Sequence, residues 1–403
     1  MKDFNKKARA YALKNALHYN GKANQGAVIS GLFAEGLKKE DVKKFSKEIN
    51  EIVCSVNNLS LEEQEKEYEK IKELVSERET REGLEELPGV SLKKGVIMRF
   101  RPAPSGPLHV GHIISNLISS LYVKKYGGKL YIIIDDTSPD TTLSEAYTNI
   151  KRDCDWIFGN VTEYINSSDR MNLYYEYIEK IIKKNRGYIC TCSPEKFKGF
   201  SELKENCPCR NNDLKENIYR WSKMLDKKKG FKPGEAVLRF KSDLGMQDPN
   251  PAMRDFPLAR IIEKEHPKQK NKYRVWPLMN LVVSVDDIEL GMTHIIRGKD
   301  HMDNAKRQKM IFDLFGKNFP WTYFMGRIKF KDLILSKRKI NALIDSGEFS
   351  GDDDEKIPTI ASLRKRGYKP EAFVKFVEQR GLTEVDKVID SKEFFKIIDS
   401  FNK

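Results

Sequence analysis

The sequence lacks the features that mark several large classes of protein. No apolar run is long enough to span a bilayer, and residues 1–20 are basic and helix-forming without the apolar core of a signal peptide. Internal repeats, a Walker-type phosphate loop and the glycine fingerprint of a dinucleotide-binding fold are all missing. Cysteine is scarce, with six in 403 residues, and a cytosolic chain does not use clustered cysteines for disulfides. We therefore expect a cytoplasmic protein that does not enter a membrane.

Charge of both signs is abundant, but the basic side predominates. Lysine and arginine number 73 against 59 aspartate and glutamate residues, which gives a net charge of +14. Such a surplus fits a polyanionic partner such as RNA. It also fits lysines scattered over a solvated surface, so charge alone does not decide between these interpretations. The length of 403 residues suggests two or three domains.

The stretch around two histidines organises the rest of the chain. Residues 95–100 have the pattern of a buried strand, and residues 113–126 carry apolar side chains at helical spacing. Prolines and a glycine between them exclude a helix or a central strand there. His109 and His112 therefore lie at the start of a helix, beside Gly111, which leaves the main chain accessible. Because a helix N-terminus offers free N–H groups to anions, this turn is predicted to hold phosphates.

A second strand, predicted at 129–134, ends in a pair of acidic residues, Asp135 and Asp136. In a doubly wound parallel sheet, groups at the carboxyl ends of the strands face the ligand crevice. The same two residues also suit a turn as caps, an alternative that the sequence leaves open. The alternation of strands and helices from residue 95 to about residue 159 predicts an α/β fold with a parallel sheet of the Rossmann type.

The alternating pattern returns after residue 234. The apolar run 278–285 ends in two aspartates, and we expect it to form a strand. Another short strand is predicted at 294–298, with Arg297 near its carboxyl end. A basic group at that place is again where an open α/β sheet binds its ligands.

Residues 335–339 read Leu-Ser-Lys-Arg-Lys and precede a helix-like segment at 340–346. Three cations and a serine in five residues suit a mobile loop that binds polyphosphate, because a lysine ammonium group is a compact donor to phosphate oxygens. Basic runs are also common on the surface of a chain with 73 basic residues, which is the alternative explanation.

Four of the six cysteines form two Cys-x-Cys pairs, Cys190 with Cys192 and Cys207 with Cys209. Two such pairs joined by a loop can place four thiolates at the corners of a tetrahedron, as a structural zinc ion requires. Unliganded buried thiols are the alternative, but they rarely recur twice at this spacing. Because protein ligands would fill all four positions, the predicted zinc braces an insertion and takes no part in catalysis.

Together, these motifs resemble those of the class I aminoacyl-tRNA synthetases, specifically glutamyl-tRNA synthetase of the archaeal and eukaryotic type. Residues 109–112 match the first signature of that class, and residues 335–339 match a variant of the second. The other matching segments are 11–15, 135–139, 273–277, 286–287, 291–298, 349–351, 364–367 and both cysteine pairs. The matches occur in order over nearly the whole chain.

The resemblance implies a reaction in two steps. ATP, assisted by Mg²⁺, activates the carboxylate of an amino acid as an aminoacyl-adenylate, and the aminoacyl group then passes to the 3′ end of tRNA. The resemblance assigns His109, His112 and Lys337 to stabilisation of the transition state. It places ATP contacts at Pro104, Gly111, Ser336 and Lys339, amino-acid contacts at Arg99, Arg101, Asp135, Met279 and Arg297, and tRNA contacts at Arg364 and Arg366.

Three positions of the implied amino-acid pocket depart from the family pattern. Met279 stands where the family usually has tyrosine, Ile133 replaces an arginine, and Arg101 replaces a small apolar residue. The loss of one hydrogen-bond donor costs about 1 to 3 kcal/mol in the recognition of a side-chain carboxylate. Arg101 either restores a cation or indicates a different amino acid, and the sequence leaves both interpretations open.

The resemblance and the changes of pattern predict five segments. They are an N-terminal helical appendage (1–94), two halves of a catalytic domain (95–185 and 236–325), a zinc-binding insertion for the tRNA acceptor end (186–235), and a basic loop with helices that contact the tRNA stem (326–403). No run of short alternating strands remains for the β-barrel that reads the anticodon in family members. We expect that module to be absent or to be supplied by a second polypeptide.

Three functions remain open at this stage. The first is glutamate–tRNA ligation. The second belongs to a truncated paralogue that activates an amino acid for another acceptor, such as a modified tRNA nucleoside or a carrier. The third is a non-catalytic, regulatory RNA-binding role, which is disfavoured because such a protein needs neither phosphate signature. The altered pocket keeps the second function open.

Overall fold

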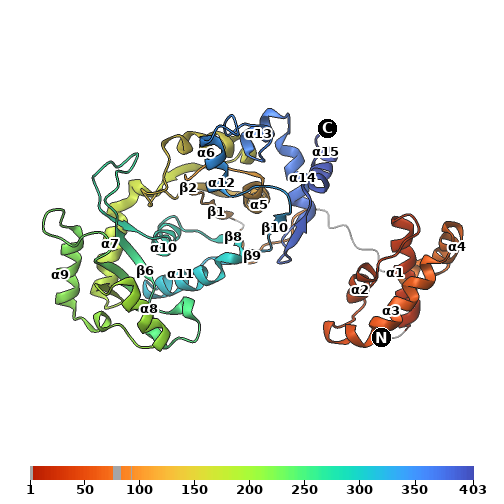
Figure 1. Cartoon of the computed structure of the whole chain (residues 1–403), viewed down its shortest axis with the longest axis horizontal. Coiled ribbons are helices and arrows are strands. Elements are labelled where there is room, and N and C mark those ends of the chain that lie inside the picture. Colours follow the sequence, from red (N-terminus) through yellow and green to blue (C-terminus); the bar gives the residue numbers. More distant parts are fainter. Residues whose placement is uncertain (1–2, 76–82, 92) are drawn as a thin grey trace. The chain divides into compact units, whose positions relative to one another are not determined.

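The computed structural model describes residues 3–75, 83–91 and 93–403. The chain divides into two units, Met1–Arg81 and Glu82–Lys403 (Figure 1). No helix within these described ranges is long and apolar enough to cross a membrane.

The first unit is helical, as the sequence predicts for its described part. It contains α1 (Phe4–His18), α2 (Gln25–Ala34), α3 (Val42–Asn57) and α4 (Leu61–Ile71). Helix α1 lies at its centre and contacts the three other helices. Its buried face is rich in alanine, which lets neighbouring helices approach closely, and the side chains of this face are Ala8, Ala12, Leu13 and Ala16.

The start of α4 forms a capping box. The Ser60 side chain accepts a hydrogen bond from the backbone N–H of Glu63, and the Glu63 carboxylate accepts one from the backbone N–H of Ser60. Replacing Ser60 by alanine is expected to destabilise the helix by about 1 kcal/mol, which raises the opening equilibrium of α4 about fivefold. Amide hydrogen exchange over residues 61–71 measures this change. A Ser60→Asp variant retains a capping oxygen and should exchange like the wild type, so equal acceleration in both variants would contradict the assignment.

The second unit is built on a parallel sheet, which confirms the α/β prediction. Strands β1 (Val96–Phe100), β2 (Gly128–Ile134) and β3 (Glu163–Asn166) pair in parallel, connected by α5 (Val110–Tyr126) and α6 (Ser144–Phe158). Both faces of this sheet are covered, so its strands are nearly continuous apolar runs.

Strands β8 (His294–Gly298) and β9 (Trp321–Met325) pair in parallel as a second, two-stranded sheet beside β1, with α11 (Met302–Leu314) connecting them in the chain. Thr293 makes this junction, because its backbone N–H donates to the Ile97 carbonyl and its hydroxyl accepts from the Ile97 N–H. The strands therefore lie in the spatial order β3-β2-β1-β8-β9, as two separately hydrogen-bonded sheets that meet at Thr293. The chain changes direction between β1 and β8, and a crevice lies at the carboxyl ends of these two strands.

An antiparallel sheet separates the two parallel sheets in sequence. It contains β4 (Gly187–Cys190), β5 (Val237–Phe240), β6 (Pro257–Ile261) and β7 (Val275–Pro277). Helices α7 (Met171–Lys183), α8 (Pro194–Leu203) and α9 (Leu214–Leu225) belong to the same region and lie together in Figure 1.

The prediction of a strand at 278–285 is wrong, because this run forms most of helix α10 (Met279–Glu289). Seven consecutive side chains from Leu281 to Asp287 are buried, so the helix has neighbours on all sides there. A short run that is apolar on every face has the same pattern in a buried strand and in a buried helix, and periodicity cannot separate the two. The aspartates at its end therefore lie on a helix, where they pair with arginines.

The C-terminal part combines helices with a small parallel sheet. The helices are α12 (Lys337–Asp345), α13 (Ile360–Lys365), α14 (Pro370–Arg380) and α15 (Ser391–Phe401), and strand β10 (Ile328–Phe330) pairs with β11 (Lys387–Ile389). The sequence analysis predicted a loop and helices for this part of the chain and missed β11, which has only three residues. The expected basic loop is also shorter than predicted, because Lys337 begins α12 and the three cations occupy its first turn.

Candidate active site

A cavity of about 480 Å³ opens where the carboxyl ends of β1, β2 and β8 meet the N-termini of α5, α10 and α12. The predicted site residues that line it are Arg99, Arg101, His109, Gly111, His112, Asp135, Met279, Arg297 and Lys337. Residues far apart in sequence thus meet at the crevice that the strand order creates. Pro104, Ser336 and Lys339 were also predicted to contact ATP, but the described lining does not include them.

The two histidines are held by the backbone of the helix start. His109 is the N-cap of α5, and its Nδ1 accepts a hydrogen bond from the Gly111 N–H at 3.2 Å. His112 Nδ1 accepts from the His109 N–H at 3.0 Å. The two rings lie against each other with centroids 3.9 Å apart. Both rings are therefore oriented by main-chain groups of the same helical turn.

This arrangement sets the protonation of both imidazoles. A ring nitrogen that accepts a hydrogen bond carries no proton, so the proton of each neutral ring is assigned to Nε2. Burial and the Lys337 charge lower the pKa of His109 to about 4, and burial together with the charge of His109 lowers the pKa of His112. Both rings are consequently neutral at physiological pH, and each has an Nε2–H as its free donor.

Lys337 reaches the same cavity from α12. Its Nζ donates to the Ala103 carbonyl at 2.8 Å, on the turn between β1 and α5. Burial lowers the pKa of Lys337 to about 8. The helix is fixed over this turn because Asn341 Nδ2 donates to the Ser105 carbonyl at 3.0 Å. Gly106 makes the approach feasible, since its φ is +146° and a Cβ there would lie 2.8 Å from Asn341 Oδ1.

The lowered pKa of Lys337 predicts a pH dependence. In the free protein, its ammonium group loses its charge as the pH rises through about 8, so kcat/KM for ATP in the reaction that the sequence resemblance implies should fall above that pH. A Lys337→Arg variant keeps its charge and should move this fall to higher pH. Pyrophosphate exchange at low ATP from pH 6 to 9.5 measures both profiles. Coincident profiles would contradict a charged role for this side chain.

Arg101 is held by internal partners on every side. Its Nε donates to Asp135 at 3.2 Å, and its Nη1 donates to Asp286 at 2.7 Å. Its Nη2 donates to the Ser167 hydroxyl at 2.7 Å. Burial opposes the charge, but Asp135 and Asp286 outweigh it and raise the pKa of Arg101. The Arg101 guanidinium therefore connects the ends of β1 and β2 to α10 at the base of the cavity.

Arg99 and Arg297 differ in how far their charges are neutralised. Arg99 makes a bidentate ion pair with Asp287, with Nε and Nη2 at 2.5 and 2.8 Å from the two carboxylate oxygens. Arg297 has a neutral partner, the Gln308 side chain, to which its Nη1 donates at 2.8 Å. Burial and the nearby charge of Arg99 lower the pKa of Arg297 to about 10. Arg297 is thus a cation placed to attract an anionic ligand.

The cavity also has lining residues that the sequence analysis missed. They are Ser115, Asn116, Val283, Asp300, His301, Arg327 and Arg380, among others. Asp300 and His301 follow the predicted strand 294–298 after one intervening residue, and that position was an available signal. The remaining residues come from helix interiors and from distant segments, where no local pattern marks them.

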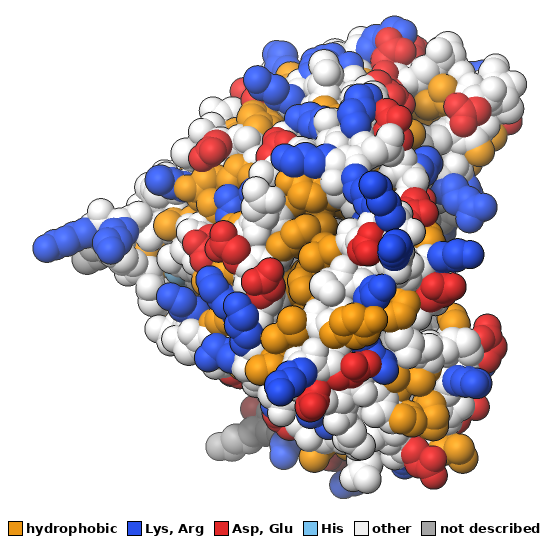
Figure 2. All heavy atoms as spheres, turned by 90° about the vertical axis from the view of Figure 1, so that its left-hand side faces the viewer, with side chains coloured by type: hydrophobic (Ala, Val, Ile, Leu, Met, Phe, Trp, Pro, Cys, Tyr) orange, Lys and Arg blue, Asp and Glu red, His pale blue; other side chains and the backbone are white. Residues whose placement is uncertain are grey.

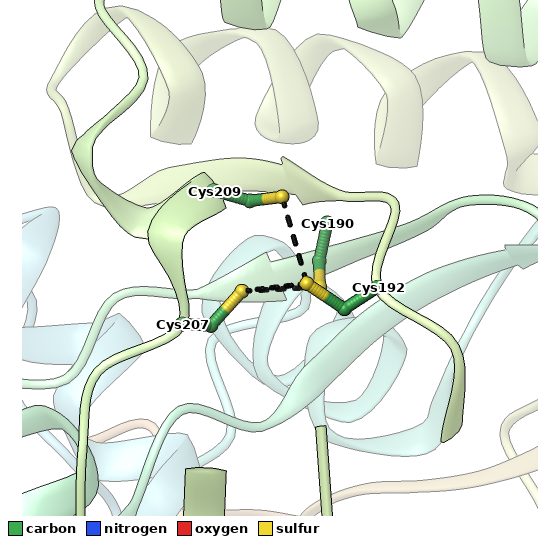
Figure 3. A group of neighbouring side chains, drawn as sticks. All are labelled: Cys190, Cys192, Cys207 and Cys209. Carbon is green, nitrogen blue, oxygen red and sulfur yellow. Dashed lines mark hydrogen bonds between the residues drawn. The ribbon is translucent and has the colours of Figure 1, made fainter. Parts of the chain in front are cut away.

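The four cysteines converge as predicted (Figure 3). Their sulfur atoms all lie within 4.8 Å of one another, with separations of 3.3 Å for Cys192 and Cys207 and 3.5 Å for Cys190 and Cys207. These distances are too long for disulfide bonds. Four sulfurs at about 2.3 Å from a central zinc ion would lie about 3.8 Å apart, so the cluster fits a tetrahedral zinc site.

The surroundings of the cysteines also suit a metal–thiolate centre. Arg220 Nη1 approaches Cys209 Sγ at 3.5 Å and can offset negative charge on the sulfurs. Hydrogen bonds from Cys190 and Cys207 lower the pKa of Cys209. The pairs come from the end of β4 and from the short helical turn Pro208–Asn211, so a metal would join these two segments.

The two arginines predicted to contact tRNA lie at the end of α13. Arg364 and Arg366 are both exposed. The Arg366 guanidinium lies over the rings of Tyr368 and Phe395, at 5.1 and 5.0 Å from their centroids. This stacking holds a charged group at the surface, with no ion pair to it among the described residues, which suits contact with a phosphate backbone.

Comparison with known proteins decides the family. Residues 95–400 match the family model for the catalytic domain of class I tRNA synthetases (E and Q). The chain belongs to this family. Its glutamate–tRNA ligase relatives include those of Methanocaldococcus jannaschii, 41% identical over 93% of this chain, and Methanopyrus kandleri, 39% identical over 97%. The chain spans about two thirds of their lengths, 66% and 69% respectively.

Solved structures of a glutamate tRNA ligase and a glutamate-tRNA synthetase share the fold. A glutamate tRNA ligase from Elizabethkingia meningosepticum superposes with a TM-score of 0.53, covering 77% of this chain and 69% of that structure, at 21% sequence identity. The glutamate-tRNA synthetase from Elizabethkingia anophelis gives a TM-score of 0.51 over 75% of this chain. At this level of identity the similarity concerns the fold, which agrees with the parallel sheet described above.

Proposed function

We propose that this synthetase-family chain is a glutamate–tRNA ligase. It activates glutamate with ATP to glutamyl-adenylate and transfers the glutamyl group to the 3′ end of tRNA. The observation that carries this proposal is the convergence of two neutral imidazoles and Lys337 on one cavity with Arg297 and Asp135. The choice of glutamate as the amino acid rests on the glutamate–tRNA ligase relatives, which are 39–41% identical to this chain.

The geometry supports an in-line attack with no protein nucleophile. The substrate carboxylate attacks the α-phosphorus of ATP, and pyrophosphate leaves. His109 and His112 donate through Nε2–H to phosphate oxygens on which charge accumulates, and Lys337 neutralises the departing pyrophosphate. Because these donors are fixed by the backbone before substrate binds, little reorganisation is needed in the transition state.

The amino-acid contacts follow from the charges that remain in the cavity. Arg297 has no carboxylate among its described hydrogen-bond partners, so we assign it to the side-chain carboxylate of glutamate. Arg99, while it stays paired with Asp287, also contacts an oxygen of the substrate carboxylate. Asp135 receives the α-amino group of the substrate. Arg101 acts through Asp135, which it holds in place. Met279 contributes an apolar wall instead of a donor.

Divalent metal would enter with ATP. Among the described residues that line the cavity, Asp135 and Asp300 are the ones that carry a carboxylate. Mg²⁺ would therefore be held mainly by the phosphates, whose charge it neutralises.

The region around the four cysteines is assigned to the acceptor end of tRNA, with zinc bound by Cys190, Cys192, Cys207 and Cys209. Figure 2 looks onto the end of the second unit that carries α9, where basic and acidic side chains are spread over the face with hydrophobic ones between them. On α9, Ile218 and Tyr219 are 46% and 56% exposed, and Lys223 lies 5.7 Å from the centre of the Tyr219 ring. Aromatic and basic groups together bind unpaired nucleotides by stacking and by charge.

The test is amino-acid-dependent exchange of pyrophosphate into ATP, run with each amino acid and with or without total tRNA. Exchange with glutamate, followed by formation of glutamyl-tRNA, is the expected result. Exchange with a different amino acid would overturn the substrate assignment, and the absence of exchange with all of them would overturn the enzymatic function.

A further inference from the structure

Two buried amide side chains continue a chain of hydrogen bonds that begins at Arg297 in the active-site cavity. Gln308 on α11 and Asn280 on α10 are 1% and 8% exposed, and the described lining of the cavity includes neither. Gln308 Oε1 accepts a hydrogen bond from Arg297 Nη1 at 2.8 Å, and Gln308 Nε2 donates to Asn280 Oδ1 at 3.3 Å. Gln308 thus connects the cation of the cavity to α10. The sequence analysis gave neither amide a role.

Gln308 is unusual for its place on α11. The buried side chains of this helix recur at helical spacing and form one face, which consists of Ala305, Gln308, Ile311 and Phe312. Gln308 is the polar member of this set, and α11 packs against α10. Burying a primary amide costs free energy unless its oxygen and its NH₂ group both find partners. Both have partners here, so the residue type at this position serves a specific set of hydrogen bonds.

The arginine determines how the Gln308 amide is oriented. A guanidinium group has donors only, so Gln308 presents its oxygen to Arg297 and its NH₂ group to Asn280. A reversed amide would set two donors against each other and lose the hydrogen bond to Arg297. Because Gln308 is held by α11 and by its bond to α10, it fixes the position of the guanidinium before a ligand binds.

The hydrogen-bond partner of Arg297 is neutral, unlike the partners of the other two arginines in the cavity. Arg99 forms an ion pair with Asp287, and Arg101 forms one with Asp286. A glutamate in place of the glutamine on α11 would have the same length and would reach the same nitrogen atom. It would also neutralise the guanidinium, because the two groups would form an ion pair. The amide therefore supplies the position of a carboxylate partner without its charge.

We propose that Gln308 is a positioning residue that makes the pocket selective for an acidic over a neutral amino acid. It orients the Arg297 guanidinium and leaves the positive charge of this group to a carboxylate of the substrate. The inference rests on the proposed function, because it takes the side-chain carboxylate of glutamate as the ligand of Arg297. Gln308 acts through Arg297 and does not itself contact the substrate.

The experiment compares the wild type with Gln308→Glu in pyrophosphate exchange with glutamate and with glutamine, in the presence of tRNA. The substitution should raise KM for glutamate about 10- to 100-fold and change kcat less than about threefold, because a charged hydrogen bond to the bound substrate is lost. For glutamine, kcat/KM should change less than about threefold, so the preference for glutamate falls. KM for ATP should stay within about twofold, which excludes a phosphate as the anion that Arg297 binds.

Two further variants separate the effect of charge from that of structure. Gln308→Met keeps the length and the neutrality of the side chain but loses both hydrogen bonds. It should raise KM for glutamate less than Gln308→Glu does and retain the preference for glutamate. The matched control is Lys309→Gln, which lowers the net charge by the same amount on the same helix, at an exposed side chain outside the described cavity lining. Its kinetic constants should stay within about twofold of the wild type.

An unchanged KM for glutamate in Gln308→Glu would overturn the inference. So would a loss of kcat that is equal for glutamate and glutamine, since a merely structural role predicts that result. A KM for ATP that rises as far as KM for glutamate would also overturn it, because Arg297 would then bind a phosphate.

Thermal unfolding with and without glutamate adds a measurement that needs no catalysis. Glutamate should raise the Tm of the wild type and leave that of Gln308→Glu unchanged at the same concentration. If this pattern is found but the wild type exchanges no pyrophosphate, the proposed function fails and the inference stands. If the wild type exchanges with glutamate and Gln308→Glu behaves like it in both assays, the inference fails alone. A wild type that glutamate neither stabilises nor activates for exchange would overturn both.

Discussion

Replacing Lys337 by methionine is expected to lower kcat for adenylate formation by about 10² to 10³-fold, because the proposed charged donor to the departing phosphates is lost. Methionine has nearly the same length, so the packing of α12 over the turn at Ala103 should persist. The affinity for ATP should fall much less than kcat, since the charge on the phosphate oxygens increases toward the transition state. Pre-steady-state measurement of adenylate formation at several ATP concentrations separates the two effects.

The control is Lys331→Met, which removes an exposed charge that the described cavity lining does not include. It should retain wild-type kinetics. His112→Ala should resemble Lys337→Met in its effect on kcat, because the proposed mechanism makes His112 Nε2–H a second donor to the same phosphates. Equal losses in kcat and in ATP affinity for Lys337→Met would contradict a role specific to the transition state.

Removal of zinc is the second change with a large expected effect. A bound zinc ion contributes on the order of 10 kcal/mol to the stability of a small cysteine-ligated unit. In this chain it would join the end of β4 to the turn Pro208–Asn211. A Cys207→Ser variant should lose zinc, and proteases should then cleave between β4 and α9, while the parallel sheet remains intact.

Zinc content, measured by a colorimetric chelator assay, and limited proteolysis test this expectation together. Cys54→Ser is the matched control, because Cys54 is exposed on α3 and is not part of the four-cysteine cluster. It should bind zinc and resist proteases like the wild type. A wild-type protein purified without zinc, and unaffected by chelators, would contradict the metal assignment.

The phosphate-binding turn was predictable because its signals are local. Prolines exclude regular structure there, and the periodicity changes from strand to helix within fourteen residues, so His109 and His112 could be placed at a helix start. The cysteine pairs were predictable for a similar reason, since the spacing within each pair brings two sulfurs together. Their convergence depends on β4 and one short turn, and the structure confirms it.

Other parts of the site could not be predicted from local pattern. The run 278–285 has no polar side to reveal its periodicity, and only its surroundings make it a helix. Arg101 was predicted to face the amino acid, and it does line the cavity, but its hydrogen bonds go to Asp135, Asp286 and Ser167. The fold decides how many carboxylates contact each arginine, and it thereby decides which arginine can bind an anionic ligand.

By itself, the sequence determined the class of chemistry. Each motif favours one kind of chemistry in any fold that exposes it. The motifs are the two phosphate signatures, the acidic pair after a strand and the cysteine pairs. The tertiary structure decided which groups act together. Thr293 joins β8 to β1 and so creates the crevice, and α12 brings Lys337 to within 2.8 Å of the Ala103 carbonyl. Charge neutralisation depends on distances between residues nearly two hundred positions apart, and only the folded chain fixes those distances.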